Sequence, residues 1–275
     1  MIQALLDHAF LRHALLAGLL ASIACGVIGT YVVVRRLSYL AGGISHSCYG
    51  GIGLAIFFDF SPILGATLFA LLSAVAIGLA DRRLKQGAET AISVIWAGGM
   101  ALGVLLVALS PGYAPNLGSY LFGNILFVPP ADLLLMGLLD LVILLVVVLL
   151  FRPLAAVAYD EEFAAVGNLP VLRLYLLQLL LIALTVVILI RVVGIILVIA
   201  LLVLPAAIAR QFSRGLAGMM VRATLLGMVF TVSGLAGSYL LDRQGLPAPS
   251  GALIILLAVL AYAGTSLWSA HRPRR

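Results

Sequence analysis

The chain has 275 residues, of which 64% are hydrophobic and 9% are charged, and its mean hydropathy is +1.25. This composition excludes a soluble globular domain of this length and indicates a polytopic membrane protein. The formal net charge of +6 does not indicate a nucleic-acid partner, because the basic residues stand at the ends of apolar runs, where they set membrane topology.

The first apolar segment predicts a membrane span rather than a signal peptide. Asp7 and His8 stand where a signal peptide carries basic residues, and the apolar run continues past Cys25 to Val34. Cys25 and Cys48 both fall within predicted spans, so we expect buried free thiols and no disulfide framework.

Division of the chain at charges, proline and glycine predicts an all-α bundle of about nine transmembrane helices, because a span needs about 20 apolar residues. No soluble domain is expected, so residues 1–275 form one membrane domain. The predicted spans are Ala14–Val34, Gly42–Phe60, Ile63–Ala80, Thr90–Leu109, Asp132–Phe151, Leu172–Ile190, Val192–Ala209, Leu216–Leu241 and Ser250–Ala270.

One segment between predicted spans, Pro111–Val128, is too short and too rich in glycine to cross a membrane. We expect a short outward-facing helix or a re-entrant piece, since such backbone is tolerated where it lines a cavity or is buried in protein.

The loops predict the orientation, because cytoplasmic loops carry an excess of Lys and Arg. If nine spans alternate, most basic residues fall on one side, which we assign to the cytoplasm. The N-terminus is then outside and the C-terminus inside. The basic residues on the cytoplasmic side are Arg35, Arg36, Arg82, Arg83, Lys85, Arg152, Arg210, Arg214, Arg222, Arg272, Arg274 and Arg275.

The sequence shows no apparatus of a hydrolytic or redox enzyme. A P-loop needs a lysine between glycine and Ser or Thr, but the single lysine, Lys85, lies between Leu84 and Gln86. The HExxH, GxSxG and CxxC patterns are also absent. We therefore expect that the chain is not an enzyme and that it has no permanently bound cofactor.

His46 is the candidate functional residue, because it is the only histidine far from both ends of the chain. An ionisable residue inside a membrane is by default a functional hypothesis. The alternative is a packing role, in which the imidazole hydrogen-bonds to a neighbouring helix. Glycines on both sides, including Gly43 and Gly50, permit close backbone approach and suit either a packed interface or a narrow path.

The loop after the fifth predicted span, within residues 153–170, holds all but one of the glutamates of the chain. Acidic residues at its start predict a short helix with a favourable dipole interaction. The loop is either a solvated connector or a docking element for a cytoplasmic partner. The candidate docking residues are Asp160, Glu161, Glu162, Phe163, Ala164 and Gly167.

The seventh predicted span contains Pro205, which removes a backbone hydrogen bond from an otherwise uniform helix. We therefore expect a helix kink at Pro205. Small residues beside it, Ala206 and Ala207, permit close helix packing.

Together these segments resemble the permease subunits of ABC importers for divalent metals of the zinc and manganese type. The resemblance covers nearly the whole chain, and it is carried by the order and spacing of several stretches. These are Gly29–Leu40 (GTYVVVRRLSYL), Gly43–His46 (GISH), Ser119–Leu126 (SYLFGNIL), the Asp160–Gly167 loop and Val193–Ala207.

The resemblance implies a permease of the type II ABC importer class in a bacterial inner membrane. It implies a homodimer, a separate cytoplasmic ATP-binding subunit that docks on the Asp160–Gly167 loop, and an external metal-binding protein. The transported ion is then a divalent transition metal, with zinc expected first and manganese or iron next.

The sequence departs from the family pattern at Gly42, where many members carry an aspartate four residues before the histidine that corresponds to His46. Carboxylate and imidazole would there share one helical face. In this chain His46 would act with Ser45, Cys48, or a group from another span or from the second protomer. The ligand set, and with it the metal, stays open.

The alternative function is a stand-alone secondary metal transporter driven by an ion gradient. Such proteins place paired charges at mid-membrane, often on broken helices of inverted repeats. Here Asp140 is the one acid that could lie at mid-span, and no internal repeat is apparent. An intramembrane enzyme that pairs Ser45 or Ser47 with His46 is disfavoured, because adjacent helical residues point in different directions.

Overall fold

The structure is a computed structural model that describes residues 9–83, 88–110, 128–246 and 248–270, with Gly123 and Ile125. These residues form helices and short connections, without a strand. Seven helices are membrane-length over nearly their whole extent, and the first part of α10 is the eighth. Their bounds are α2 Ala9–Val34, α3 Ser38–Phe57, α4 Pro62–Arg83, α5 Ala88–Leu109, α7 Pro130–Leu149, α10 Val171–Phe212, α11 Leu216–Asp242 and α12 Ser250–Ala270.

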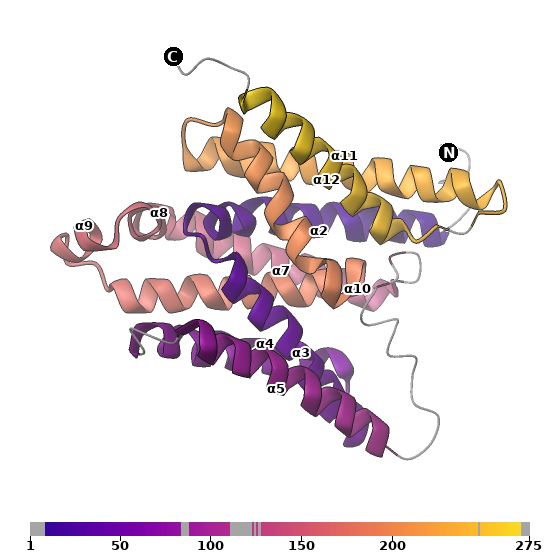
Figure 1. Cartoon of the computed structure of the whole chain (residues 1–275), viewed down its shortest axis with the longest axis horizontal. Coiled ribbons are helices and arrows are strands. Elements are labelled where there is room, and N and C mark those ends of the chain that lie inside the picture. Colours follow the sequence, from indigo (N-terminus) through magenta and orange to yellow (C-terminus); the bar gives the residue numbers. More distant parts are fainter. Residues whose placement is uncertain are drawn as a thin grey trace.

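The predicted sixth and seventh spans are the two halves of α10, which is broken at Gly194. Gly194 has φ 74° and ψ 168°, a conformation that essentially only glycine adopts. After the break the chain turns away from its first direction and climbs towards α11 and α12 (Figure 1). The last part, Val198–Phe212, is an apolar helix shorter than a full span.

The sequence did not predict the break at Gly194, and the kink expected at Pro205 stays a prediction. Pro205 lies inside the second half of α10, and Gly194 is the residue of this helix with non-helical backbone angles. A proline still allows helical φ, whereas the positive φ of Gly194 reorients the whole following helix.

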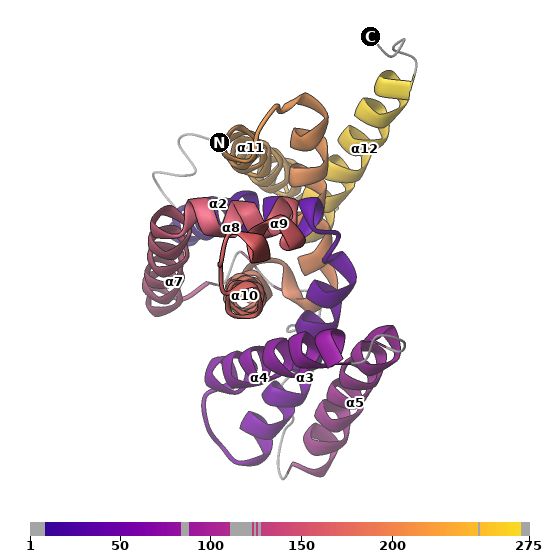
Figure 2. The ribbon, with the colours of Figure 1, turned by 90° about the vertical axis from the view of Figure 1, so that its left-hand side faces the viewer.

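The helices form three packed groups in the view along the bundle (Figure 2). Helices α3, α4 and α5 lie together on one side, and α11 and α12 lie with the second half of α10 on the other. Helices α2 and α7 and the first half of α10 lie between them. This arrangement places α3 in contact with α4, α5 and α10.

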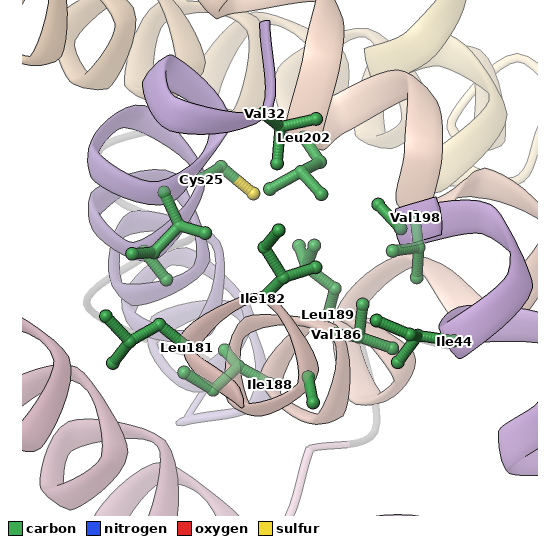
Figure 3. Close-up of a cluster of buried hydrophobic side chains, with 14 of the residues drawn as sticks. Cys25, Val32, Ile44, Leu181, Ile182, Val186, Ile188, Leu189, Val198 and Leu202 are labelled. Atoms are coloured by element: carbon green, nitrogen blue, oxygen red, sulfur yellow. The ribbon is translucent and has the colours of Figure 1, made fainter. Parts of the chain in front are cut away.

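Part of the buried core lies between α2, α3 and the two halves of α10 (Figure 3). Cys25 and Val32 of α2 face side chains from both halves of α10, and Ile44 joins them from α3. Cys25 and Cys48 are buried free thiols, as the sequence predicted.

Two short helices follow α7: α8, Phe151–Tyr159, and α9, Glu161–Val166. Helix α9 is the short helix that the acidic loop predicted. The outward-facing piece expected at Pro111–Val128 lies outside the described residues, apart from Gly123, Ile125 and Val128.

Candidate functional site

Helix α3 is held between α4 and α5 by contacts that only glycine permits. A Cβ atom on Gly51 would lie 2.1 Å from the carbonyl oxygen of Gly65 in α4. On the other side, a Cβ atom on Gly103 of α5 would lie 2.3 Å from the carbonyl oxygen of Tyr49. The backbones therefore touch on both faces, which is typical of membrane helices that pack through small residues.

The imidazole of His46 projects from α3 onto the indole of Trp96 in α5. The two ring centroids are 4.4 Å apart and the planes differ by 9°, so the rings are stacked. The His46 side chain is half-buried, and its Nδ1 atom is buried without a hydrogen-bond partner among the described residues. A nitrogen lone pair without a donor is available to a cation that reaches it.

Ser45 and Cys48, the other candidates from the sequence, donate their hydrogen bonds to backbone carbonyl groups. The hydroxyl of Ser45 donates to the carbonyl oxygen of Ile195, just after the break in α10, at 3.3 Å. The thiol of Cys48 donates to the carbonyl oxygen of Ile44 in its own helix at 3.1 Å. Both side chains are fully buried, so the structure gives them packing contacts.

The described part of one protomer contains no cluster of three or more His, Cys, Asp or Glu side chains that could hold a metal ion. The prediction that Ser45 or Cys48 completes a site with His46 therefore gains no support from the contacts of these residues. A group from a second protomer, which the sequence also allowed, stays a prediction.

Gly42 lies close to the same site, one turn before His46. A Cβ atom on Gly42 would lie 3.0 Å from Cδ1 of Ile199 and 3.6 Å from the indole of Trp96. A larger residue at this position would thus have to displace the end of the Ile199 side chain. Trp96 was missed in the sequence, and the available signal was a large amphipathic ring in the middle of an otherwise aliphatic span.

Two acids lie on the buried face of α7. Asp132 is in the first turn of this helix, where its charge interacts favourably with the helix dipole. Asp140 lies in the middle of the helix and is 3% exposed, and neither of its carboxylate oxygens has a hydrogen-bond partner among the described residues.

Helix α9 separates the predicted docking residues into two groups. Asp160 caps the helix by accepting a hydrogen bond from the backbone N–H of Phe163 at 3.0 Å. Ala164 is buried against the bundle. Glu161 turns inward to Arg35 and Arg82.

The outer side of α9 presents the other docking candidates. Glu162 and Gly167 are exposed, and Phe163 and Val166 are 73% and 83% exposed. Apolar side chains this exposed at the end of a bundle are typical of an interaction site.

Apolar helices of spanning length, a polar residue in the most buried of them and an exposed short helix at one end define a membrane-spanning transport subunit. The chain belongs to the ABC 3 transport family, whose model matches residues 7–269. It is a multi-pass permease subunit and not itself an enzyme, as the absence of catalytic motifs predicted.

Relatives and a solved structure agree with this assignment over nearly the whole chain. The chain is 46% identical to the uncharacterized membrane protein slr2045 of Synechocystis, over 95% of this chain and 91% of the relative. It is 32% identical to a manganese transport system membrane protein, MntC, of Halalkalibacterium halodurans, over 94% of this chain and 87% of the relative. The structure of PsaBC from Streptococcus pneumoniae in complex with Fab matches with a TM-score of 0.86 and 28% identity, over 96% of this chain and 93% of that chain.

Proposed function

We propose that the chain is the membrane-spanning subunit of an ATP-driven importer of a divalent transition metal ion. Family membership supports ATP-driven transport, and the manganese named for a relative supports a metal cargo. We place manganese first and zinc or iron next, a change from the order that the sequence suggested. The thiol of Cys48 donates to the backbone of its own helix. The soft sulfur ligand that would favour zinc is therefore engaged elsewhere.

The observation that carries the metal assignment is the imidazole of His46. It lies on the buried helix α3, stacked on Trp96, with Nδ1 free of a hydrogen-bond partner among the described residues. Neutral imidazole binds iron and zinc well and manganese more weakly, so this ligand supports a transition metal cargo, and the manganese named for a relative supports the order. A single such ligand binds weakly enough to release its ion, which transport requires.

An importer of this kind would need three partners: an ATP-binding subunit, a second permease and a metal-binding protein. The exposed face of α9, with Glu162, Phe163 and Val166, is where a cytoplasmic ATP-binding subunit would dock. A second copy of the permease would bring a second His46 to a shared path, and an external metal-binding protein would deliver the ion.

The orientation is part of the proposal. Arg35 after α2 and Arg82 at the end of α4 meet at the α9 end of the bundle, where both contact Glu161. By the positive-inside rule this end is cytoplasmic, which puts the N-terminus outside and the C-terminus inside a bacterial inner membrane.

The test is uptake of manganese, zinc and iron by vesicles that contain this chain, its ATPase and its binding protein. We expect ATP-dependent uptake, reduced about 10-fold to 100-fold by His46→Ala while the complex still assembles. Cys48→Ala is the matched control and should retain uptake, because the thiol is buried in the core and donates its hydrogen bond to the backbone of its own helix.

Two outcomes would contradict the proposal. Equal uptake by His46→Ala would return His46 to a packing role. Uptake driven by an ion gradient, by this chain without an ATPase, would favour the secondary transporter instead.

A further inference from the structure

One carboxylate, that of Glu161 in α9, is shared by two arginines from different transmembrane helices. Arg35 follows α2 directly, and Arg82 belongs to the last turn of α4. Each donates a hydrogen bond to Oε1 of Glu161, from Arg82 at 2.6 Å. The Arg35 side chain is 9% exposed, so this is a partly buried pair and not a solvated surface contact.

A tyrosine of α10 supports both arginines. The guanidinium carbons of Arg35 and Arg82 lie 4.8 Å and 4.4 Å from the ring centroid of Tyr175, within the range of cation–π contacts. The Tyr175 hydroxyl donates to Oδ2 of Asp81 in α4 at 2.6 Å. The two guanidinium groups therefore have a support besides Glu161.

Arg35 also extends the network to α8. It donates to the side-chain oxygen of Gln178 in α10, and the Gln178 amide donates to the carbonyl oxygen of Leu154 in α8 at 3.1 Å. Five elements, α2, α4, α8, α9 and α10, are thus joined through one polar network. Such networks are strong when every member is satisfied.

The neighbouring glutamate shows that this contact is specific to Glu161. Glu162 is exposed on the outer side of α9 and pairs with no cation among the described contacts. Helix α9 therefore has an outer face for a partner and an inner face, with Glu161 and Ala164, that is attached to the membrane helices.

The arginines lie where they can move α3. Arg35 belongs to the tight turn between α2 and α3, in which Arg36 has φ 58° and the N–H of Leu37 donates to the carbonyl oxygen of Val32. Arg82 lies in the last turn of α4, and Ile77 in the same part of α4 packs against the start of α3, since its Cδ1 would lie 3.3 Å from a Cβ atom on Gly43. A displacement of Glu161 would thus act on the start of α3 through Arg35 and on α4 through Arg82.

We propose that Glu161 is the positioning residue that ties α9 to the α2–α3 turn and to α4. Through this tie, movement of a docked ATPase shifts α3 and with it His46. The inference rests on the proposed function, because it assumes that a partner moves α9. Glu161, Arg35 and Arg82 would transmit that movement. The exposed residues on the outer side of α9 would bind the partner.

The test compares Glu161→Gln with Glu162→Gln in the assembled importer. We expect Glu161→Gln to lower the number of metal ions transported per ATP by about tenfold, a typical coupling energy between sites. Co-purification of the ATPase and its rate of ATP hydrolysis should stay within about twofold, because the outer face of α9 is unchanged. Glu162→Gln should keep the wild-type ratio of transport to hydrolysis.

A variant that keeps the charge guards against a merely structural effect. Arg82→Glu should uncouple transport, whereas Arg82→Lys should retain part of the coupling. The inference is overturned if Glu161→Gln couples normally, if it releases the ATPase, or if Arg82→Glu and Arg82→Lys couple alike.

A measurement that does not depend on metal transport tests the role of Glu161 independently of the proposed metal cargo. The chain has two tryptophans, so Trp268→Phe leaves Trp96 as a probe beside His46. With 5-fluorotryptophan in this chain alone, nucleotide should shift the fluorine resonance of Trp96 in the Glu162→Gln complex and not in the Glu161→Gln complex. If nucleotide shifts the Trp96 resonance only in the Glu162→Gln complex but no metal is taken up, the proposed metal cargo is contradicted and the role of Glu161 in coupling is retained. An equal shift of the resonance in both variants would overturn the role of Glu161.

Discussion

Helices α3 and α7 have the same length, 20 residues, yet they meet opposite surroundings. Nearly all of α3 is buried, and it contains glycines, serines and His46. Helix α7 is buried along one stripe and exposes leucine and valine elsewhere. In a membrane the lipid selects the most apolar side chains, whereas the protein interior accommodates small and polar ones. The less apolar helix is therefore the one that carries the candidate site.

The largest effect should come from filling a glycine contact of α3. Gly103→Ala places a Cβ atom 2.3 Å from the backbone oxygen of Tyr49, and we expect it to cost about 3 kcal/mol, the upper end of the range for overpacking. The measurement is thermal unfolding in detergent.

Gly98→Ala on the same helix is the matched control, because a Cβ atom there meets nothing within 4 Å. It should be neutral or stabilising by up to about 1 kcal/mol through helix propensity. Equal destabilisation by both variants would contradict close packing of α3 against α5.

The next effect concerns the buried stripe of α7. Asp140→Asn removes the charge from a buried carboxylate that has no hydrogen-bond donor among the described residues, so it should raise stability by about 1–3 kcal/mol. Thermal unfolding of the two purified proteins measures this change.

Asp132→Asn is the companion variant on the same stripe. It should lower stability by about 0.3–1 kcal/mol, because it removes a charge that favours the start of α7. A loss of stability with Asp140→Asn would show that this carboxylate has a partner that the described contacts do not include.

A smaller effect is expected for the ring that covers His46. Trp96→Leu removes the stacked contact and should cost about 0.5–1.5 kcal/mol beyond the change in buried area. Trp96→Phe retains a ring and should cost less. Equal unfolding temperatures for the two variants would argue against a stabilising stack.

The smallest effect should appear on the outer face of α7. Leu138 is 57% exposed, so Leu138→Ala should change stability by less than about 0.5 kcal/mol. A cost of several times this value, together with a loss of any dimer that wild type forms in detergent, would show that a second protomer and not lipid covers this face.

The positions of most helices could be predicted from the sequence, because apolar length is a local property. The acidic start of the α9 loop also predicted its short helix, in which Asp160 caps the first turn. The site was predicted only in part. His46 is conspicuous in an apolar sequence, but Trp96 is adjacent to it only because α3 and α5 pack through glycines.

The sequence of the loop could not predict which docking residues face the membrane helices and which face outward. Glu161 and Glu162 are adjacent and chemically alike, and only the position of Arg35 and Arg82 turns one inward and leaves the other exposed. The position of the break in α10 could not be predicted either. Proline is the usual signal of an irregular helix, whereas the residue with non-helical backbone angles is Gly194.

By itself the sequence determined that the chain crosses the membrane many times, that its basic residues gather at the ends of spans, and that one of its imidazoles, that of His46, lies far from both ends. These properties follow from the transfer of each short segment between water and lipid. The tertiary structure decided that α10 turns at Gly194, that Trp96 covers His46 and that Glu161 joins α9 to α2 and α4. These contacts unite residues far apart in the chain, so only the packing of whole helices against one another could produce them.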